Sequence, residues 1–173
     1  HSLTSSKIIV IVQLSGLLQR FPKHIKMFIS AFVIVLSIGY ITGLQFVRQT
    51  ESIVPNGIDE NYLGNEDKKD VKVMKFKKGN REMLTIIHTH ILSMSFIFFL
   101  LGGLVSMTTL SNKWKAFLMI EPFVSIILTF GGIYLLWMGV SWLKYIVMLS
   151  GTLMTMVFIG SAGVVLFQLS KKN

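Results

Sequence analysis

The sequence predicts an all-α fold: a polytopic transmembrane helix bundle with four full-length spans and a short fifth at the N-terminus. Apolar residues make up 52% of the 173 residues and charged residues only 14%, whereas soluble domains carry about 25% charged residues. Four apolar stretches reach the roughly 20 residues that a helix needs to cross a bilayer. These observations exclude an ordinary soluble domain, whose surface would need far more polar groups.

The N-terminal region, residues 1–24, holds one short apolar segment, Lys7–Phe21. This segment is shorter than the roughly 20 residues of a full span, although a count from Leu3 allows a short one. An interfacial helix and an uncleaved signal-like segment are the alternatives. Pro22 follows and interrupts the chain.

The other spans are predicted as residues 25–47 and a three-helix unit, 83–169, which a basic tail, 170–173, follows. Their apolar segments are Ile25–Val47, Met83–Leu110, Ala116–Met138 and Trp142–Leu169. The first contains Gly39 and Gly43 at the spacing of a helix-contact motif, and chance spacing is the alternative. Aromatic side chains near span ends are typical of membrane interfaces. Here they are Trp114, Trp137, Trp142 and Tyr145.

Residues 48–82 form the one long polar loop, acidic in its first half and basic in its second. Apolar side chains interleave with its lysines, as in a segment that lies on lipid headgroups. They are Val71, Val73, Met74 and Phe76. The stretch Asn61–Asp67 lacks the spacing of a calcium loop and is predicted to be a solvated turn. The opposite face carries only basic residues, so we expect that face to be cytoplasmic.

Composition and motifs exclude several classes of function. The chain has no cysteine, which excludes disulfides and cysteine-based zinc sites. It has no phosphate-binding glycine loop, nucleophile elbow or His-Glu-x-x-His motif, so nucleotide-driven and hydrolase activities have no support, and whether it is an enzyme stays open. The net charge is +9, and the basic residues lie beside apolar spans, which indicates lipid headgroups rather than nucleic acid as the partner.

The best candidates for chemistry are His88 and His90, because polar residues inside spans are costly and usually functional. Two positions on a helix differ by about 200°, so the two rings point to opposite faces. The face of His88 continues with small and polar residues, which favours His88 as the interior ligand or proton carrier and His90 as the second choice. If His90 faces inward, Met94 could be its partner on haem or copper. An interfacial histidine bonded to a carbonyl is the alternative.

Glu121 is the second candidate, a carboxylate followed by Pro122 near the predicted start of a span. One interpretation places it at a helix cap at the interface. The other makes it a proton-accepting carboxylate on a face that continues with Ser125 and Thr129. Glu121 and His88 lie at opposite ends of their spans, so they could bracket a proton path but not share a metal.

Four runs of sequence resemble a family of small inner-membrane proteins of the Bacteroidota. They are Gly57–Glu66, Met74–Lys78, His88–Ser93 and Phe117–Phe123. Members of that family are often mislabelled elongation factor one alpha, and their function is undefined. The resemblance implies a multi-pass protein of the bacterial inner membrane. It does not imply a translation factor, because the chain has no Gly-x-x-x-x-Gly-Lys-Ser/Thr loop. Thr85–Gly103 also resembles the span ends of haem-bearing respiratory subunits.

Three functions follow as hypotheses. The first is a subunit of a respiratory or electron-transfer complex with a histidine-based haem b, copper, zinc or proton site, and a site without any cofactor is also compatible. The second is a non-catalytic accessory or assembly subunit. The third, a small-solute or ion transporter, ranks last because the bundle is small for alternating access. The expected partners are the lipid bilayer and other membrane subunits or a second copy.

Overall fold

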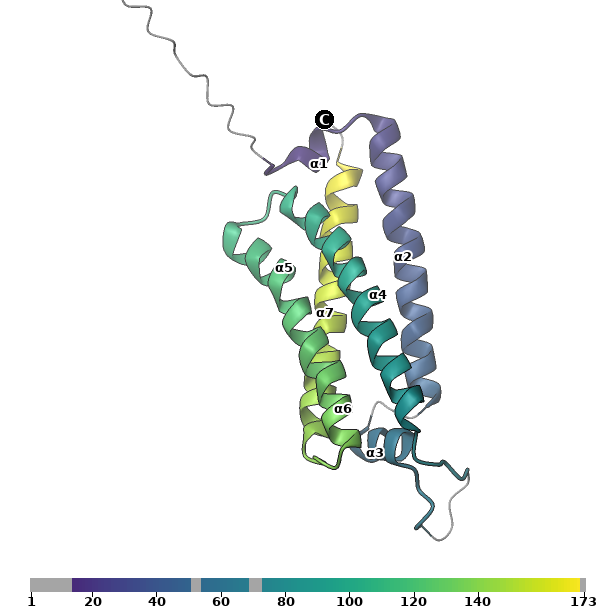
Figure 1. Ribbon diagram of the computed structural model, residues 1–173. Helices are drawn as coiled ribbons and strands as arrows, with labels where there is room; N and C mark the ends of the chain where they lie inside the picture. The colour runs from purple at the N-terminus through teal and green to yellow at the C-terminus, as the bar shows by residue number, and fades with distance from the viewer. Residues whose placement is uncertain (1–13, 51–53, 69–72, 172–173) are drawn as a thin grey trace, which may run out of the picture.

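The computed structural model describes residues 14–50, 54–68 and 73–171, which form an all-α bundle without strands in those ranges. Four helical segments are long and apolar enough to cross a membrane (Figure 1). They are α2, Lys23–Gln49; α4, Asn80–Ser106; the continuous segment of α5, Asn112–Ile126, a π-helical turn, Ile127–Gly131, and α6, Gly132–Trp137; and α7, Leu143–Ser170. The predicted fold class and its four full-length spans are confirmed.

The N-terminal segment ends in a cap on the bundle. Gly16 has φ +77° and precedes the four-residue helix α1, Leu17–Arg20. The Gly16 amide donates to the Thr108 carbonyl at 3.2 Å, and the Leu18 side chain is buried. Among the described residues of the predicted segment Lys7–Phe21, the helix covers only Leu17–Arg20, so the choice between a short span and an interfacial helix stays a prediction. Residues 1–13 lie outside the described ranges.

The bundle is built around α7. Helices α4 and α5 pack against each other and against α7, whereas α2 packs chiefly on α7. Gly132 lies so close to α7 that a Cβ atom there would meet Val147 Cγ2 at 2.8 Å. Gly39 and Gly43, in contrast, have no atom within 4 Å of such a Cβ. The predicted glycine contact motif on α2 therefore makes no close packing with the described part of this chain.

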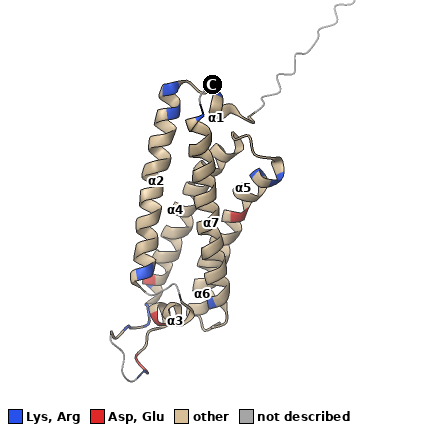
Figure 2. Cartoon of the chain, turned by 180° about the vertical axis from the view of Figure 1, so that it is seen from behind, with Lys and Arg blue, Asp and Glu red and all other residues tan. Residues whose placement is uncertain are grey.

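Charged residues mark the two ends of the bundle. Figure 2 shows the lysines and arginines gathered at the helix ends, with apolar or neutral surface along the helices between them apart from one acidic position in α5. Large apolar side chains along the spans remain exposed in the isolated chain, among them Phe28, Phe96 and Phe99. Lipid is the medium that such a surface requires, and the chain is a multi-pass membrane protein.

The predicted polar loop contains a helix that was not predicted from the sequence. Helix α3, Pro55–Leu63, lies across one end of the bundle and buries Ile58 against it (Figure 1). Asp59 anchors it to α7 through an ion pair with Lys144 Nζ at 2.5 Å. Its sequence signal was proline at the first helical position and glycine just after the last. Asn61–Asp67 is thus not a plain turn, because its first three residues belong to α3.

Candidate functional site

A groove of about 900 Å³ lies between α2 on one side and α4, the π-helical turn, α6 and α7 on the other. Most of its lining is aliphatic, aromatic or methionine side chains, with a few hydroxyl groups and one imidazole. The lining includes Tyr40, His90, Met94, Thr129, Phe130 and Thr155. An apolar wall with few polar groups is the usual make-up of a site for a small hydrophobic ligand.

The hydroxyl groups of Tyr40, Thr129 and Thr155 in the groove wall already have partners. Thr155 donates to the Gly151 carbonyl at 2.9 Å, so its single proton is used and the Tyr40 hydroxyl is the donor in their 3.3 Å bond. Thr129 donates in the same way to Ser150 Oγ at 2.7 Å, because Ser150 gives its own proton to the Ile146 carbonyl. These bonds tie α2 and the π-helical turn to α7 and leave little hydrogen-bonding capacity for a ligand.

His90 offers a free acceptor in the groove. Its Nδ1 lies 2.7 Å from the Ile86 carbonyl oxygen. A carbonyl can only accept, so Nδ1 carries the proton and the neutral ring keeps an unshared electron pair on Nε2. The Phe130 ring lies beside the imidazole at 5.1 Å between centroids. No partner for Nε2 is found among the described residues, which leaves this nitrogen for a ligand.

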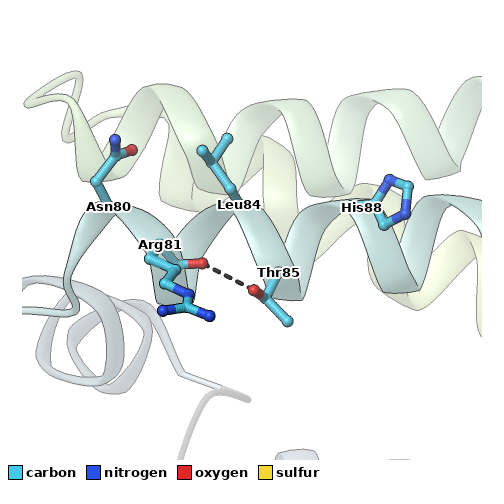
Figure 3. Close-up of a pocket in the computed structure, with 5 residues that line it drawn as sticks. All are labelled: Asn80, Arg81, Leu84, Thr85 and His88. Atoms are coloured by element: carbon cyan, nitrogen blue, oxygen red, sulfur yellow. Dashed lines mark hydrogen bonds between the residues drawn. The ribbon is translucent and has the colours of Figure 1, made fainter.

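The structure reverses the expected order of the two histidines. His88 is exposed on the outer side of α4, in a shallow groove with Asn80, Arg81, Leu84 and Thr85, as Figure 3 shows. His90 is also exposed in the isolated chain, but it faces the groove on the side of α4 that continues with Met94 and the fully buried Leu101 and Val105. Lipid tails are as apolar as buried side chains. The polarity of a residue in a span therefore does not show whether it faces lipid or another helix, as it would in water. That is why the stripe of small polar residues misled the prediction.

Met94 lies one helical turn beyond His90, and both side chains line the groove. Two ligands from one face of one helix cannot occupy the opposite axial positions of a single haem. His24, the other histidine that could complete a haem site, is near the start of α2, at the end of the bundle away from the first turns of α4. Within the described ranges no group of three His, Cys, Asp or Glu side chains could hold a metal ion.

Glu121 lies deep in its span rather than at a cap. Helix α5 begins at Asn112, nine residues earlier, which at 1.5 Å per residue puts Glu121 about 14 Å along the helix. The cap interpretation is therefore wrong, and Pro122 lies inside the helix. Ser125 donates to one carboxyl oxygen, and the other is buried with no partner among the described residues. Glu121 does not line the groove, so it and His90 do not form one site.

Two parts of the groove wall, Tyr40 and the π-helical turn, were not predicted from the sequence. Tyr40 is a polar residue in the middle of a span, so the rule that selected the histidines would also have found it. The π-helical turn, in contrast, has no sequence signal that we recognise. It places neighbouring residues Thr129 and Phe130 in the buried wall, one bonded to α7 and the other beside His90.

Residues 52–173 match a protein family described as a transmembrane helical domain. The chain belongs to this family. The match includes every described residue from α3 to α7, and hence His90 and most of the groove wall. No curated protein sequence and no solved structure is detectably similar to the chain. The family assignment agrees with a small multi-pass membrane protein and names no activity.

Proposed function

We propose that the protein is a subunit of a membrane electron-transfer assembly that binds an elongated, membrane-soluble molecule in the groove. His90 accepts a hydrogen bond, and then the proton, from a hydroxyl group of that molecule. The observation that carries the proposal is the bond from His90 Nδ1 to the Ile86 carbonyl. It fixes the tautomer that leaves Nε2 as an acceptor.

The groove suits a ligand with a small polar head and a long apolar body. Its volume of about 900 Å³ lies within the range of small-molecule sites, about 300–1,000 Å³. Because the groove lies along the spans, such a ligand can enter from the lipid phase. A hydroquinone with an apolar tail is one chemical class that combines these features with an acidic hydroxyl.

Imidazole is well matched to the proposed step, since it gains and loses protons near neutral pH. The bond to the Ile86 carbonyl holds the ring while Nε2 takes the proton, and the imidazolium can donate from both nitrogens. The Phe130 ring, beside the imidazole, limits its rotation. The electrons of a hydroquinone would pass to a redox centre of another subunit.

The experiment is ¹⁵N NMR of histidine-labelled protein in nanodiscs, titrated with a decyl-substituted hydroquinone. We expect saturable movement of the His90 Nε2 resonance and weaker binding of the hydroquinone to His90→Gln. His88→Gln is the matched control, because His88 lies on the same helix two residues away but outside the groove. The dimethoxy analogue, which has no hydroxyl proton, should bind at least tenfold more weakly.

Two results would contradict the proposal. One is an Nε2 resonance that moves equally with the hydroquinone and with its dimethoxy analogue. The other is hydroquinone binding that is unchanged in His90→Gln but lost in His88→Gln, which would move the site to the outer face of α4.

A second candidate function is redox chemistry at a metal held by the same nitrogen, in a haem b, copper or zinc site. The observation that favours it is the free Nε2 of His90, which could bind haem iron by itself or copper together with Met94. The remaining ligand would come from another subunit or a second copy. A visible spectrum, reduced minus oxidised, together with elemental analysis of the protein purified in its assembly, tests this. A haem or copper signal lost in His90→Ala would support it, and a metal-free assembly would rule against it.

A further inference from the structure

The segment that leads into α4 exposes apolar side chains outside the spans. Met74 is 57% exposed and Phe76 is 67% exposed. Both precede Asn80, where α4 begins, by only a few residues. Exposed apolar side chains along a span face lipid, but the same exposure beyond the end of a span needs another explanation.

This segment is held in a fixed position by the rest of the fold. The buried side chain of Asn65 accepts from the Lys75 amide at 2.7 Å and donates to the Val73 carbonyl at 3.0 Å. Trp137 Nε1 donates to the Lys78 carbonyl at 2.8 Å. These bonds attach the segment to the end of α3 and to α6, so the fold presents Met74 and Phe76 at the level where α4 begins.

Two cations accompany these apolar side chains. Lys77 Nζ lies over the Trp137 ring, 5.4 Å from its centroid. Arg81 lines the outer groove on α4, of about 570 Å³, and its guanidinium has no ion pair with a described residue. In Figure 3 Arg81 and Thr85 project from one side of α4, Leu84 projects from the other side, and His88 lies further along the helix, toward the interior of the span. Lys78, in contrast, is neutralised by Glu82 at 2.6 Å.

We propose that Met74, Phe76, Lys77 and Arg81 form a binding surface for an anionic phospholipid of the adjoining leaflet. Lys77 and Arg81 would bind the headgroup phosphate, because guanidinium and ammonium groups pair well with phosphate oxygens. Met74 and Phe76 would lie between neighbouring headgroups, and an acyl chain would follow the outer groove past Leu84 and His88. The mixture of apolar and cationic side chains at a span end is the pattern of an interfacial lipid contact.

The test uses site-directed spin labelling, which the absence of native cysteine makes simple. The full chain with Met74→Cys, labelled with a nitroxide, is placed in nanodiscs of phosphatidylcholine with or without phosphatidylglycerol. We expect the label to become accessible to oxygen and shielded from a water-soluble nickel reagent only when phosphatidylglycerol is present. Each cation contributes about a fivefold preference for the anionic surface. Lys77→Gln with Arg81→Gln should therefore shift the required phosphatidylglycerol fraction at least tenfold.

Lys113→Gln is the matched control, since this exposed lysine lies at the other end of the bundle. It should leave the response unchanged, and unchanged circular dichroism would show that all variants are folded. A label that stays water-accessible at every phosphatidylglycerol content would overturn the proposal. So would a response that the double variant keeps, or one that inorganic phosphate reproduces in pure phosphatidylcholine. Shielding of the label only when a soluble acidic protein is added would also overturn it, because the surface would then be a protein interface.

Discussion

Tyr40 is the main attachment of α2 to the bundle, and its removal gives the sharpest stability prediction. The Tyr40 ring stacks on Phe158 of α7 at 3.9 Å between centroids, with an interplanar angle of 5°. It also meets Phe98 of α4 edge-on at 6.4 Å. Its hydroxyl donates to Thr155. We expect Tyr40→Ala to weaken the docking of α2 much more than Tyr40→Phe does.

The magnitude follows from these three contacts. Undocked α2 remains in lipid, so the area term that operates in water contributes little. An aromatic pair is worth about 0.5–1.5 kcal/mol, and two pairs give about 1–3 kcal/mol. An interhelical hydrogen bond in a membrane adds about 0.6 kcal/mol. Tyr40→Ala should therefore cost about 2–4 kcal/mol in the free energy of unfolding, and Tyr40→Phe about 0.6 kcal/mol.

Steric trapping in bicelles measures this free energy directly, with the two trapping tags placed on α2 and α7. Ile41→Ala is the matched control, because Ile41 is the next residue and is 53% exposed. It should change stability by less than about 0.5 kcal/mol. Equal losses in Tyr40→Phe and Tyr40→Ala would refute the reasoning, since the ring stacking would then contribute nothing. A loss in Tyr40→Ala no larger than in Ile41→Ala would refute the docking of α2 itself.

Three further predictions concern packing, a loop anchor and pH. Gly132→Ala should lower the free energy of unfolding by about 1–3 kcal/mol in the same assay, because its Cβ would meet Val147 at 2.8 Å. Restored stability on adding Val147→Ala would identify the clash as the cause. Unchanged stability in Gly132→Ala alone would show that the helices simply move apart. Asn65→Ala should speed hydrogen exchange of the Lys75 amide by about 10- to 100-fold, since that buried amide loses its acceptor; unchanged exchange would contradict the anchor. Burial raises the pKa of the Tyr62 phenol above 10.0, so above pH 10 the unfolded chain loses a proton that the folded chain keeps, and stability falls. Tyr62→Phe should move the midpoint of alkaline unfolding upward, and an unmoved midpoint would assign that transition to other groups.

The spans could be predicted from the sequence because the bilayer imposes a length and a polarity on them. Residues 25–47 correspond to α2, Lys23–Gln49, and Trp142–Leu169 to α7, Leu143–Ser170, with ends shifted by one or two residues. Helix α3 could have been predicted from Pro55 and Gly64 but was hidden by the polarity of its surroundings. Hydropathy alone therefore located the four spans and missed α3, which lies across one end of the bundle.

The site could be predicted only in part, because its geometry depends on which face of each helix meets another helix. The two histidines do line different grooves on α4, as helical geometry predicted. The prediction that His88 is the inner one differs from the structure, because lipid-facing and buried surfaces have similar composition. Glu121 was misplaced for a different reason. Its apolar segment was predicted to begin at Ala116, whereas α5 already begins at Asn112 and places Lys113 and Lys115 in the helix.

The dependence of α2 on α7 also bears on the order in which the bundle assembles during synthesis. Helix α2 leaves the ribosome before α4, α5 and α6, but its main docking partner, α7, follows all of them. Between these two events α2 would remain in lipid without its principal contact, while α4 and α5 could already pair as an antiparallel hairpin. A chain that stops after α6 should therefore insert α2 but leave it free to diffuse or to be degraded. Quality control of this protein would then act on whether synthesis reached α7.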